Sequence, residues 1–194
     1  MAHFSRRFYQ YVRYRPKSWW RTLIAQMGFF LSRTHVPVLP TFLDAEPTNH
    51  CNQKCPGCAT GDGTLSRPVG TMKIDTFDKI IEDLGGSLNF TDLYCLGEPF
   101  LSKNIYRFIT QAKERGIYAN IDTNGILIDA EKLLDTGLDL VNFHISGTTQ
   151  DIHEAYRRGG DLVNILDNVR KLVAARAARG DHRTRIRMGM IVFK

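Results

Sequence analysis

Short apolar runs alternate with amphipathic helical patterns from residue 41 to the end of this 194-residue chain. Runs typical of strands lie at residues 41–46, 90–96, 117–123, 138–146 and 184–193. Helical patterns separate them at residues 75–84, 105–115, 129–135, 149–157 and 161–179. Crossovers of this length join parallel strands through right-handed βαβ units. The alternation therefore predicts an α/β domain built on a parallel sheet.

The first two helical patterns have well-defined limits. Asp75 is expected to be the N-cap of the first, which ends at the Gly85–Gly86 pair. The second ends at Gly116 and places four apolar residues on one face: Ile105, Phe108, Ile109 and Ala112. Both helices are expected to bury one side against the sheet.

Polar residues recur at every second position in the third and fourth strands, although parallel strands are usually apolar on both faces. They are Asn120, Asp122 and Asn124, followed by Asn142, His144 and Ser146. A polar stripe on adjacent strands is typical of the inner wall of an open or partial barrel that holds a polar ligand.

Basic charge is concentrated in the first 40 residues, which contain seven Lys/Arg and no Asp or Glu. The rest of the chain has nineteen basic and twenty acidic residues, so the main domain is neutral, which argues against a nucleic-acid-binding face. We expect residues 1–40 to form a basic, aromatic arm and residues 41–194 the folded domain. The arm is interpreted as an amphipathic helix packed on the barrel; attachment to a membrane surface is the alternative.

Three of the four cysteines lie within eight residues, at Cys51, Cys55 and Cys58. Clustered thiols in a chain without an export signal indicate a metal site in a reducing compartment, so we expect a cytoplasmic protein. Thiolates select iron–sulfur clusters, zinc or copper(I). Three cysteines around a cubane leave one iron open for a ligand, whereas structural zinc requires four ligands. His50, His144 and Cys95 are the candidates for such a fourth ligand.

The CxxxCxxC spacing, on the loop after the first strand of a βα array, resembles the radical S-adenosylmethionine (radical SAM) superfamily. Gly97-Glu98-Pro99 at the end of the second strand is similar to the GEP motif of that family. The resemblance covers residues 42–193 and implies a partial (β/α)6 barrel with five of six strands present. The chain looks like the N-terminal core of a SPASM-type member, and we expect it to be incomplete at its C-terminus.

The resemblance also implies roles for particular residues. Cys51, Cys55 and Cys58 would hold a [4Fe-4S] cluster. Gly97, Glu98 and Pro99 would receive the amino group of S-adenosylmethionine, because a strand end terminated by proline exposes unpaired carbonyls. Ser146 matches the residue that meets the ribose, Arg158 the arginine that binds the carboxylate, with Arg157 as second choice, and Asn124 is a further cofactor contact.

Two positions depart from the family pattern, and two polar residues keep a structural interpretation. Gly57 replaces a common aromatic residue before the third cysteine, and Cys95 stands where glycine is common. Cys95 is expected to behave as a small buried hydrophobe, and His144 as an interior histidine.

The activity implied is reductive cleavage of S-adenosylmethionine to a 5′-deoxyadenosyl radical, which abstracts hydrogen from a substrate that could be a peptide or protein. An external electron donor such as flavodoxin or ferredoxin would be the partner. Two alternatives stay open: a structural zinc-binding interaction module, and an iron–sulfur electron carrier that does not cleave the cofactor.

Overall fold

A computed structural model describes residues 19–191, in which five parallel strands form one sheet in the order β1-β2-β3-β4-β5. The strands are β1 (Phe42–Asp44), β2 (Phe90–Asp92), β3 (Tyr118–Thr123), β4 (Leu140–Ile145) and β5 (Arg185–Met190). The helices are α2 (Trp19–Phe30), α3 (Ile74–Leu84), α4 (Ile105–Glu114), α5 (Ala130–Asp135), α6 (Gln150–Tyr156) and α7 (Leu162–Ala178), with a 3-10 turn η1 (Pro99–Leu101). The parallel α/β architecture predicted from the alternation is confirmed.

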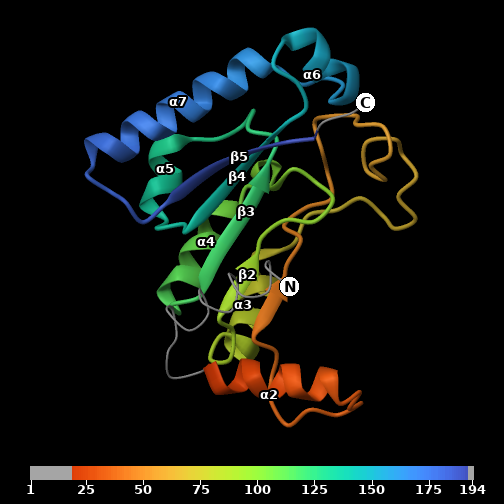
Figure 1. Cartoon of the computed structure of the whole chain (residues 1–194), viewed down its shortest axis with the longest axis vertical. Helices are drawn as coiled ribbons and strands as arrows, with labels where there is room; N and C mark the ends of the chain where they lie inside the picture. Colours follow the sequence, from red (N-terminus) through yellow and green to blue (C-terminus); the bar gives the residue numbers. More distant parts are fainter. Residues whose placement is uncertain (1–18, 192–194) are drawn as a thin grey trace.

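One face of the sheet is covered by helices α3, α4, α5 and α7 (Figure 1). Their apolar stripes meet Ile121, Val141 and Phe143 in a continuous core. The stripe predicted for the second helix is confirmed, because all four of its residues are at most 1% exposed. Burial of this face by several helices fixes the direction of the strands and leaves the opposite face to line the interior.

Several element boundaries differ from the predictions. Strand β2 ends at Asp92 rather than residue 96, so Cys95 lies in the following loop and is exposed, not buried. Helix α3 is capped by Lys73, whose backbone is extended, and the expectation of Asp75 as N-cap was wrong. Asp75 lies in the first turn, where its charge complements the positive end of the helix dipole.

The inner face of the sheet carries the polar stripe that the sequence predicted, as a ladder of hydrogen bonds across three strands. Asn120 donates from Nδ2 to Asp92 Oδ1 at 2.8 Å. Asn142 donates from its own Nδ2 to Asn120 Oδ1 at 3.0 Å and to Asp122 Oδ1 at 2.5 Å. His144 Nε2 lies 2.8 Å from Asp122 Oδ2 and completes the ladder. These bonds satisfy polar groups that the interior would otherwise leave without partners.

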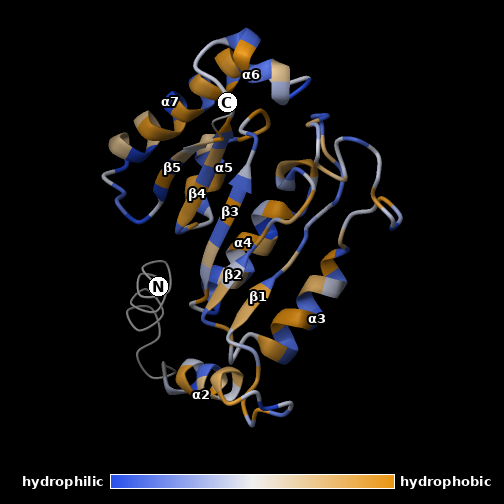
Figure 2. Cartoon of the chain, turned by 45° about the vertical axis from the view of Figure 1, so that its right-hand side comes forward, coloured by the Kyte–Doolittle hydropathy of each residue, from blue (hydrophilic) through white to orange (hydrophobic). Residues whose placement is uncertain are grey.

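Part of the basic arm lies outside the described residues, which begin at residue 19. Its described helix, α2, lies across the end of the sheet where β1 and β2 begin, far from the carboxyl ends of the strands (Figures 1 and 2). A hydrogen bond from Asn89 Nδ2 to Thr22 Oγ1 joins this helix to the barrel. None of the described helices has both the length and the apolar character needed to cross a membrane.

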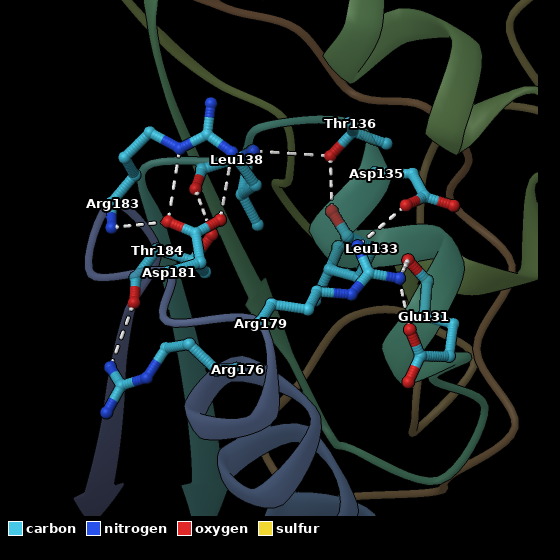
Figure 3. A network of polar contacts seen from close by, with 10 residues as sticks. All are labelled: Glu131, Leu133, Asp135, Thr136, Leu138, Arg176, Arg179, Asp181, Arg183 and Thr184. Carbon is cyan, nitrogen blue, oxygen red and sulfur yellow. Dashed lines mark hydrogen bonds and ion pairs between the residues drawn. The ribbon is translucent and has the colours of Figure 1, made fainter.

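The starts of β4 and β5 are held by a polar network around helices α5 and α7 (Figure 3). Arg179 at the end of α7 pairs with Glu131 and Asp135 on α5. Thr184 donates from Oγ1 to the carbonyl of Leu138 at 2.7 Å and joins the two strands just before they pair. Beside this network, buried Asp139 accepts from Lys113 Nζ at 2.5 Å and from the Ala119 amide at 2.8 Å.

We expect Asp139→Asn to destabilise the domain by about 2–3 kcal/mol, because it removes the anion that compensates a largely buried lysine. The Lys113 side chain is 18% exposed and that of Asp139 only 4%. Urea unfolding at neutral pH measures the change. The matched control is Asp167→Asn, which breaks an exposed pair with Arg170 and should cost about 0.5 kcal/mol or less. Equal losses in the two variants would contradict the assignment.

Candidate functional site

The three clustered cysteines lie on the loop between β1 and α3, at the carboxyl ends of the parallel strands. All three side chains are partly buried. The Cys58 amide donates to the Cys55 carbonyl at 3.2 Å, and Gly57 between them has a φ of +74°. Glycine adopts this left-handed backbone without strain. The loop therefore folds back on itself and carries its thiols on one short turn.

Gly97 allows this loop to pack against the chain that leaves β2. A Cβ atom at residue 97 would lie 2.1 Å from the Thr48 carbonyl oxygen and 2.6 Å from that of His50. The next residue, Glu98, donates its amide to the His50 carbonyl at 2.7 Å. The backbone of the Gly97-Glu98-Pro99 segment thus packs directly on the cysteine loop. Only glycine permits this close approach at position 97.

A cavity of about 230 Å³ opens at the carboxyl end of the sheet and brings together residues from five segments. From the cysteine loop come Cys51, Gln53, Cys55 and Cys58; from the loop after β2, Tyr94, Cys95, Leu96, Gly97 and Glu98; from β3, β4 and the end of α6, Asp122, Thr123, Asn124, His144 and Arg157. Of the residues predicted for the site, the three cysteines, Gly97, Glu98 and Asn124 therefore share one cavity. Open α/β sheets bind their ligands at this end of the strands.

The Glu98 side chain is buried and fully engaged by neighbouring residues. Its carboxylate accepts from the Phe100 amide at 3.2 Å, Thr123 Oγ1 at 2.7 Å and the Asn124 amide at 2.8 Å. Burial raises the pKa of Glu98, while these donors and the nearby Arg157 charge act in the opposite direction. The carboxylate joins the chain after β2 to the end of β3.

The carbonyls of Glu98 and Pro99 are not unpaired, in contrast to the sequence interpretation. They accept from the amides of Leu101 and Ser102, both at 3.0 Å, because the chain forms the η1 turn at this point. A carbonyl oxygen has two lone pairs, so each can still accept one further hydrogen bond.

The two adjacent arginines that follow helix α6 lie in different environments. Arg157 lines the cavity and donates from Nε to Ser146 Oγ at 3.0 Å. Burial raises the pKa of Cys55, and the Arg157 charge opposes this rise. Arg158 is exposed, and its backbone carbonyl accepts from the Lys54 amide at 2.9 Å. The structure therefore places Arg157, the second choice of the sequence analysis, beside the thiols.

Ser146 is buried at the end of β4, where it connects Arg157 with a residue that the sequence analysis missed. The Ser146 amide lies 3.4 Å from Nδ1 of His153, which is fully buried. Burial lowers the pKa of His153, and the Arg157 charge lowers it further. No sequence signal distinguished His153 from other polar residues of a short helix.

Asn124 connects the end of β3 to the cysteine loop, since its Nδ2 donates to Asn52 Oδ1 at 2.7 Å. The Asp122–His144 pair faces the same cavity from below. An ionised carboxylate only accepts, so His144 donates from Nε2 to Asp122. The His144 side chain is half-buried, as expected of an interior histidine, and it also lines the cavity.

The donor set fits a thiolate-bound cluster. Burial raises the pKa of the Cys51 thiol and of the Cys55 thiol, so binding as thiolates would release their protons. Among residues 19–191, no three His, Cys, Asp or Glu side chains converge on a point where a single metal ion could be held. In an iron–sulfur cubane each cysteine binds a different iron, so convergence on one point is not required.

A second cavity, of about 450 Å³, lies next to the first. Its lining is mainly apolar and includes Ile152, Tyr156 and Met190, with Ser146 at its border. Since Ser146 is bonded to Arg157, the two cavities meet at this hydrogen bond. The site therefore has a charged, sulfur-lined part and an apolar part.

Curated proteins with similar sequences include peptide cyclases and a cofactor-modifying protein. The chain is 31% identical over 124 residues to a PqqA peptide cyclase of Granulibacter bethesdensis, covering 62% of this chain and 32% of that protein. It is 30% identical over 149 residues to a PqqA peptide cyclase of Gluconobacter oxydans, covering 74% and 39%. A cofactor-modifying protein for tungsten-containing aldehyde ferredoxin oxidoreductase of Pyrococcus furiosus is 29% identical over 161 residues, covering 79% and 44%. The chain thus spans about a third to less than half of these relatives.

Solved structures share the fold. SuiB of Streptococcus suis bound to S-adenosylmethionine superposes with a TM-score of 0.59 at 18% identity, covering 82% of this chain and 36% of that one. The native anSMEcpe structure with bound AdoMet gives 0.59 at 19% identity, covering 78% and 43%, and BtrN with AdoMet and 2-DOIA gives 0.55 at 17%, covering 77% and 57%. The five-stranded sheet therefore shares its fold with these structures, which agrees with the predicted partial barrel.

The family profile described as the Radical SAM superfamily matches residues 45–190, from the end of β1 through the cysteine loop to the last residue of β5. This match covers most of the chain and contains all three clustered cysteines. The chain belongs to the radical SAM superfamily.

Proposed function

We propose that this domain binds a [4Fe-4S] cluster and S-adenosylmethionine and uses them to generate a radical that abstracts hydrogen from a substrate. The observation that carries the proposal is the convergence of Cys51, Cys55 and Cys58 with Arg157 in one cavity at the carboxyl ends of the strands. When bound, the cluster and its cofactor would supply reductive cleavage of a sulfonium to a 5′-deoxyadenosyl radical. The protein supplies ligands, orientation and exclusion of water.

Each residue of the cavity has a distinct task in this proposal. The three cysteines would hold the cluster and leave one iron open. Arg157 would bind the carboxylate of S-adenosylmethionine, because a guanidinium matches a carboxylate with two parallel hydrogen bonds. The carbonyls of Gly97, Glu98 and Pro99 would accept from its ammonium group. The border at Ser146 would receive the ribose, and the apolar second cavity the adenine.

The Asp122–His144 pair would face the substrate rather than the cofactor. It lies on the inner wall of the barrel, one layer below Glu98 and Asn124. Asn142 holds Asp122 from the other side, at 2.5 Å from Oδ1, so both partners are fixed in orientation. Through its second ring nitrogen, Nδ1, His144 would exchange a hydrogen bond or a proton with a group that enters the barrel.

We further propose a peptide or protein as the substrate and a small electron-transfer protein such as flavodoxin or ferredoxin as the reductant. Two of the relatives are named PqqA peptide cyclases, and another structure of anSMEcpe contains a peptide together with AdoMet. These names support the peptide class. Other relatives are named GTP 3′,8-cyclases, so a nucleotide is the alternative substrate to test in the same assay.

Anaerobic reconstitution is expected to load the protein with about four irons and four sulfides per chain. Addition of dithionite and S-adenosylmethionine should then yield 5′-deoxyadenosine, measured by chromatography. Cys55→Ala should lose both the cluster and the product, because the remaining two thiolates leave the cluster incompletely ligated. Cys95→Ala is the matched control and should retain both, since its thiol lies outside the motif.

Metal analysis of the same oxygen-free protein separates the alternatives. Tightly bound zinc in place of iron and sulfide would establish a structural zinc module. A cluster that is reduced by dithionite but never yields 5′-deoxyadenosine, in this chain and in longer forms that contain it, would indicate an electron carrier.

Arg157→Ala is expected to weaken the binding of S-adenosylmethionine to the reconstituted protein by about 10- to 150-fold, the value of one hydrogen bond between charged groups. Arg158→Ala should change it by about twofold or less, because its side chain is exposed. Equilibrium dialysis with labelled cofactor measures both. If Arg158→Ala weakened binding more than Arg157→Ala, the carboxylate of S-adenosylmethionine would be assigned to Arg158 instead.

A further inference from the structure

Helix α2 is attached to the barrel by its polar side. Arg21 donates from Nη1 to the carbonyl of Gly86 at 3.2 Å, and Thr22, which is 5% exposed, accepts from Asn89. Gly28 packs on the segment that follows the helix, since a Cβ atom there would lie 2.5 Å from a methyl group of Val36. Neither apolar cluster of the described residues includes a residue of α2. Hydrogen bonds of polar side chains therefore hold α2 on the barrel.

The outward side of α2 carries an apolar stripe. The residues recur with helical spacing and are 38–75% exposed: Trp20, Leu23, Met27, Phe30 and Leu31. Phe29, which is 81% exposed, lies against Phe30 at the end of the helix with a centroid separation of 6.0 Å. A helix on a water-soluble domain normally buries such a stripe and exposes its polar face. Helix α2 does the opposite, and a contiguous exposed apolar patch marks an interaction surface. This outward surface is named the α2 patch below.

The charge of residues 1–40 indicates which kind of partner binds the α2 patch. The first acidic residue of the sequence is Asp44, whereas residues 1–40 contain seven Lys/Arg. Within α2 the Arg21 guanidinium lies 5.3 Å from the centroid of the Trp20 ring. Aromatic and aliphatic side chains next to cations on an interfacial helix fit a bilayer that contains anionic lipid. A second copy of the chain would bring two basic segments together and repel.

We propose that the α2 patch binds the surface of an anionic membrane, with α2 lying parallel to the bilayer plane. The cysteine-lined cavity is at the other end of the strands (Figure 1). Membrane binding would therefore leave the cavity open to the aqueous side. This proposal is independent of the proposed catalytic function, because none of the cavity residues belongs to α2.

The chain offers its own reporter for the test. Both of its tryptophans, Trp19 and Trp20, belong to α2. We expect addition of vesicles of phosphatidylcholine with about one third phosphatidylglycerol to shift tryptophan emission to shorter wavelength and to float the protein with the vesicles. Pure phosphatidylcholine vesicles should give about tenfold weaker binding, and raising the salt concentration should release the protein from the anionic vesicles.

Phe29→Ser/Phe30→Ser should weaken binding to the anionic vesicles by about tenfold or more, because it removes two large side chains from the patch. Arg33→Glu, which reverses one exposed charge, should weaken it with a smaller salt dependence. Val163→Ser, at an apolar position of α7 that is 64% exposed, is the matched control and should bind like the parent. Circular dichroism of all variants checks that the fold is retained.

Three outcomes would overturn the proposal. They are absence of the protein from floated anionic vesicles, equal binding to neutral and anionic vesicles, and a blue shift that depends on protein concentration without lipid. The last would identify a second copy of the chain as the occupant of the patch. Loss of vesicle binding with normal 5′-deoxyadenosine formation would leave the proposed catalytic function unaffected.

Discussion

The arrangement of the site depends on the buried carboxylate of Glu98. Burying a charged group in a protein interior costs several kcal/mol unless hydrogen bonds compensate. Here the compensation comes from Phe100, Thr123 and Asn124, which belong to the η1 turn and the end of β3. Separating the chain after β2 from the end of β3 would leave the carboxylate without these partners. The hydrogen bonds of Glu98 therefore hold the two segments together. Through the Glu98 amide the same residue also holds the cysteine loop at His50.

The order and direction of the strands and helices could be predicted because they follow from local patterns. The stripe of Ile105, Phe108 and Ile109 needs only the helical period, and it is buried as expected. The spacing of the three cysteines within one loop also requires no tertiary information. The polar residues at every second position of β3 and β4 predicted the inner wall for the same reason, since side chains alternate between the faces of a strand.

The features that sequence patterns could not decide depend on tertiary contacts. Arg157 and Arg158 are neighbours in sequence, and only the backbone at the end of α6 decides which guanidinium turns toward the thiols. The burial of His153 depends on Gly160, where a Cβ atom would lie 2.6 Å from its Nε2. Strand β2 ends at Asp92, and the loop after it packs on the cysteine loop at Gly97, while Cys95 between these two points is exposed. The polar attachment of α2 likewise depends on groups near residue 89.

Asn142 is the residue of the polar ladder whose hydrogen-bonding groups are not all satisfied. Its amide nitrogen serves both Asn120 and Asp122, whereas its Oδ1 is buried and has no hydrogen-bond partner in the described part of the chain. An unsatisfied buried acceptor costs about 1–3 kcal/mol. This oxygen is almost inaccessible to solvent and Asn142 lines neither cavity, so a ligand in the cavities does not relieve the cost. The inner wall of the barrel thus keeps its polar ladder at an energetic expense that the apolar core on the other face of the sheet offsets.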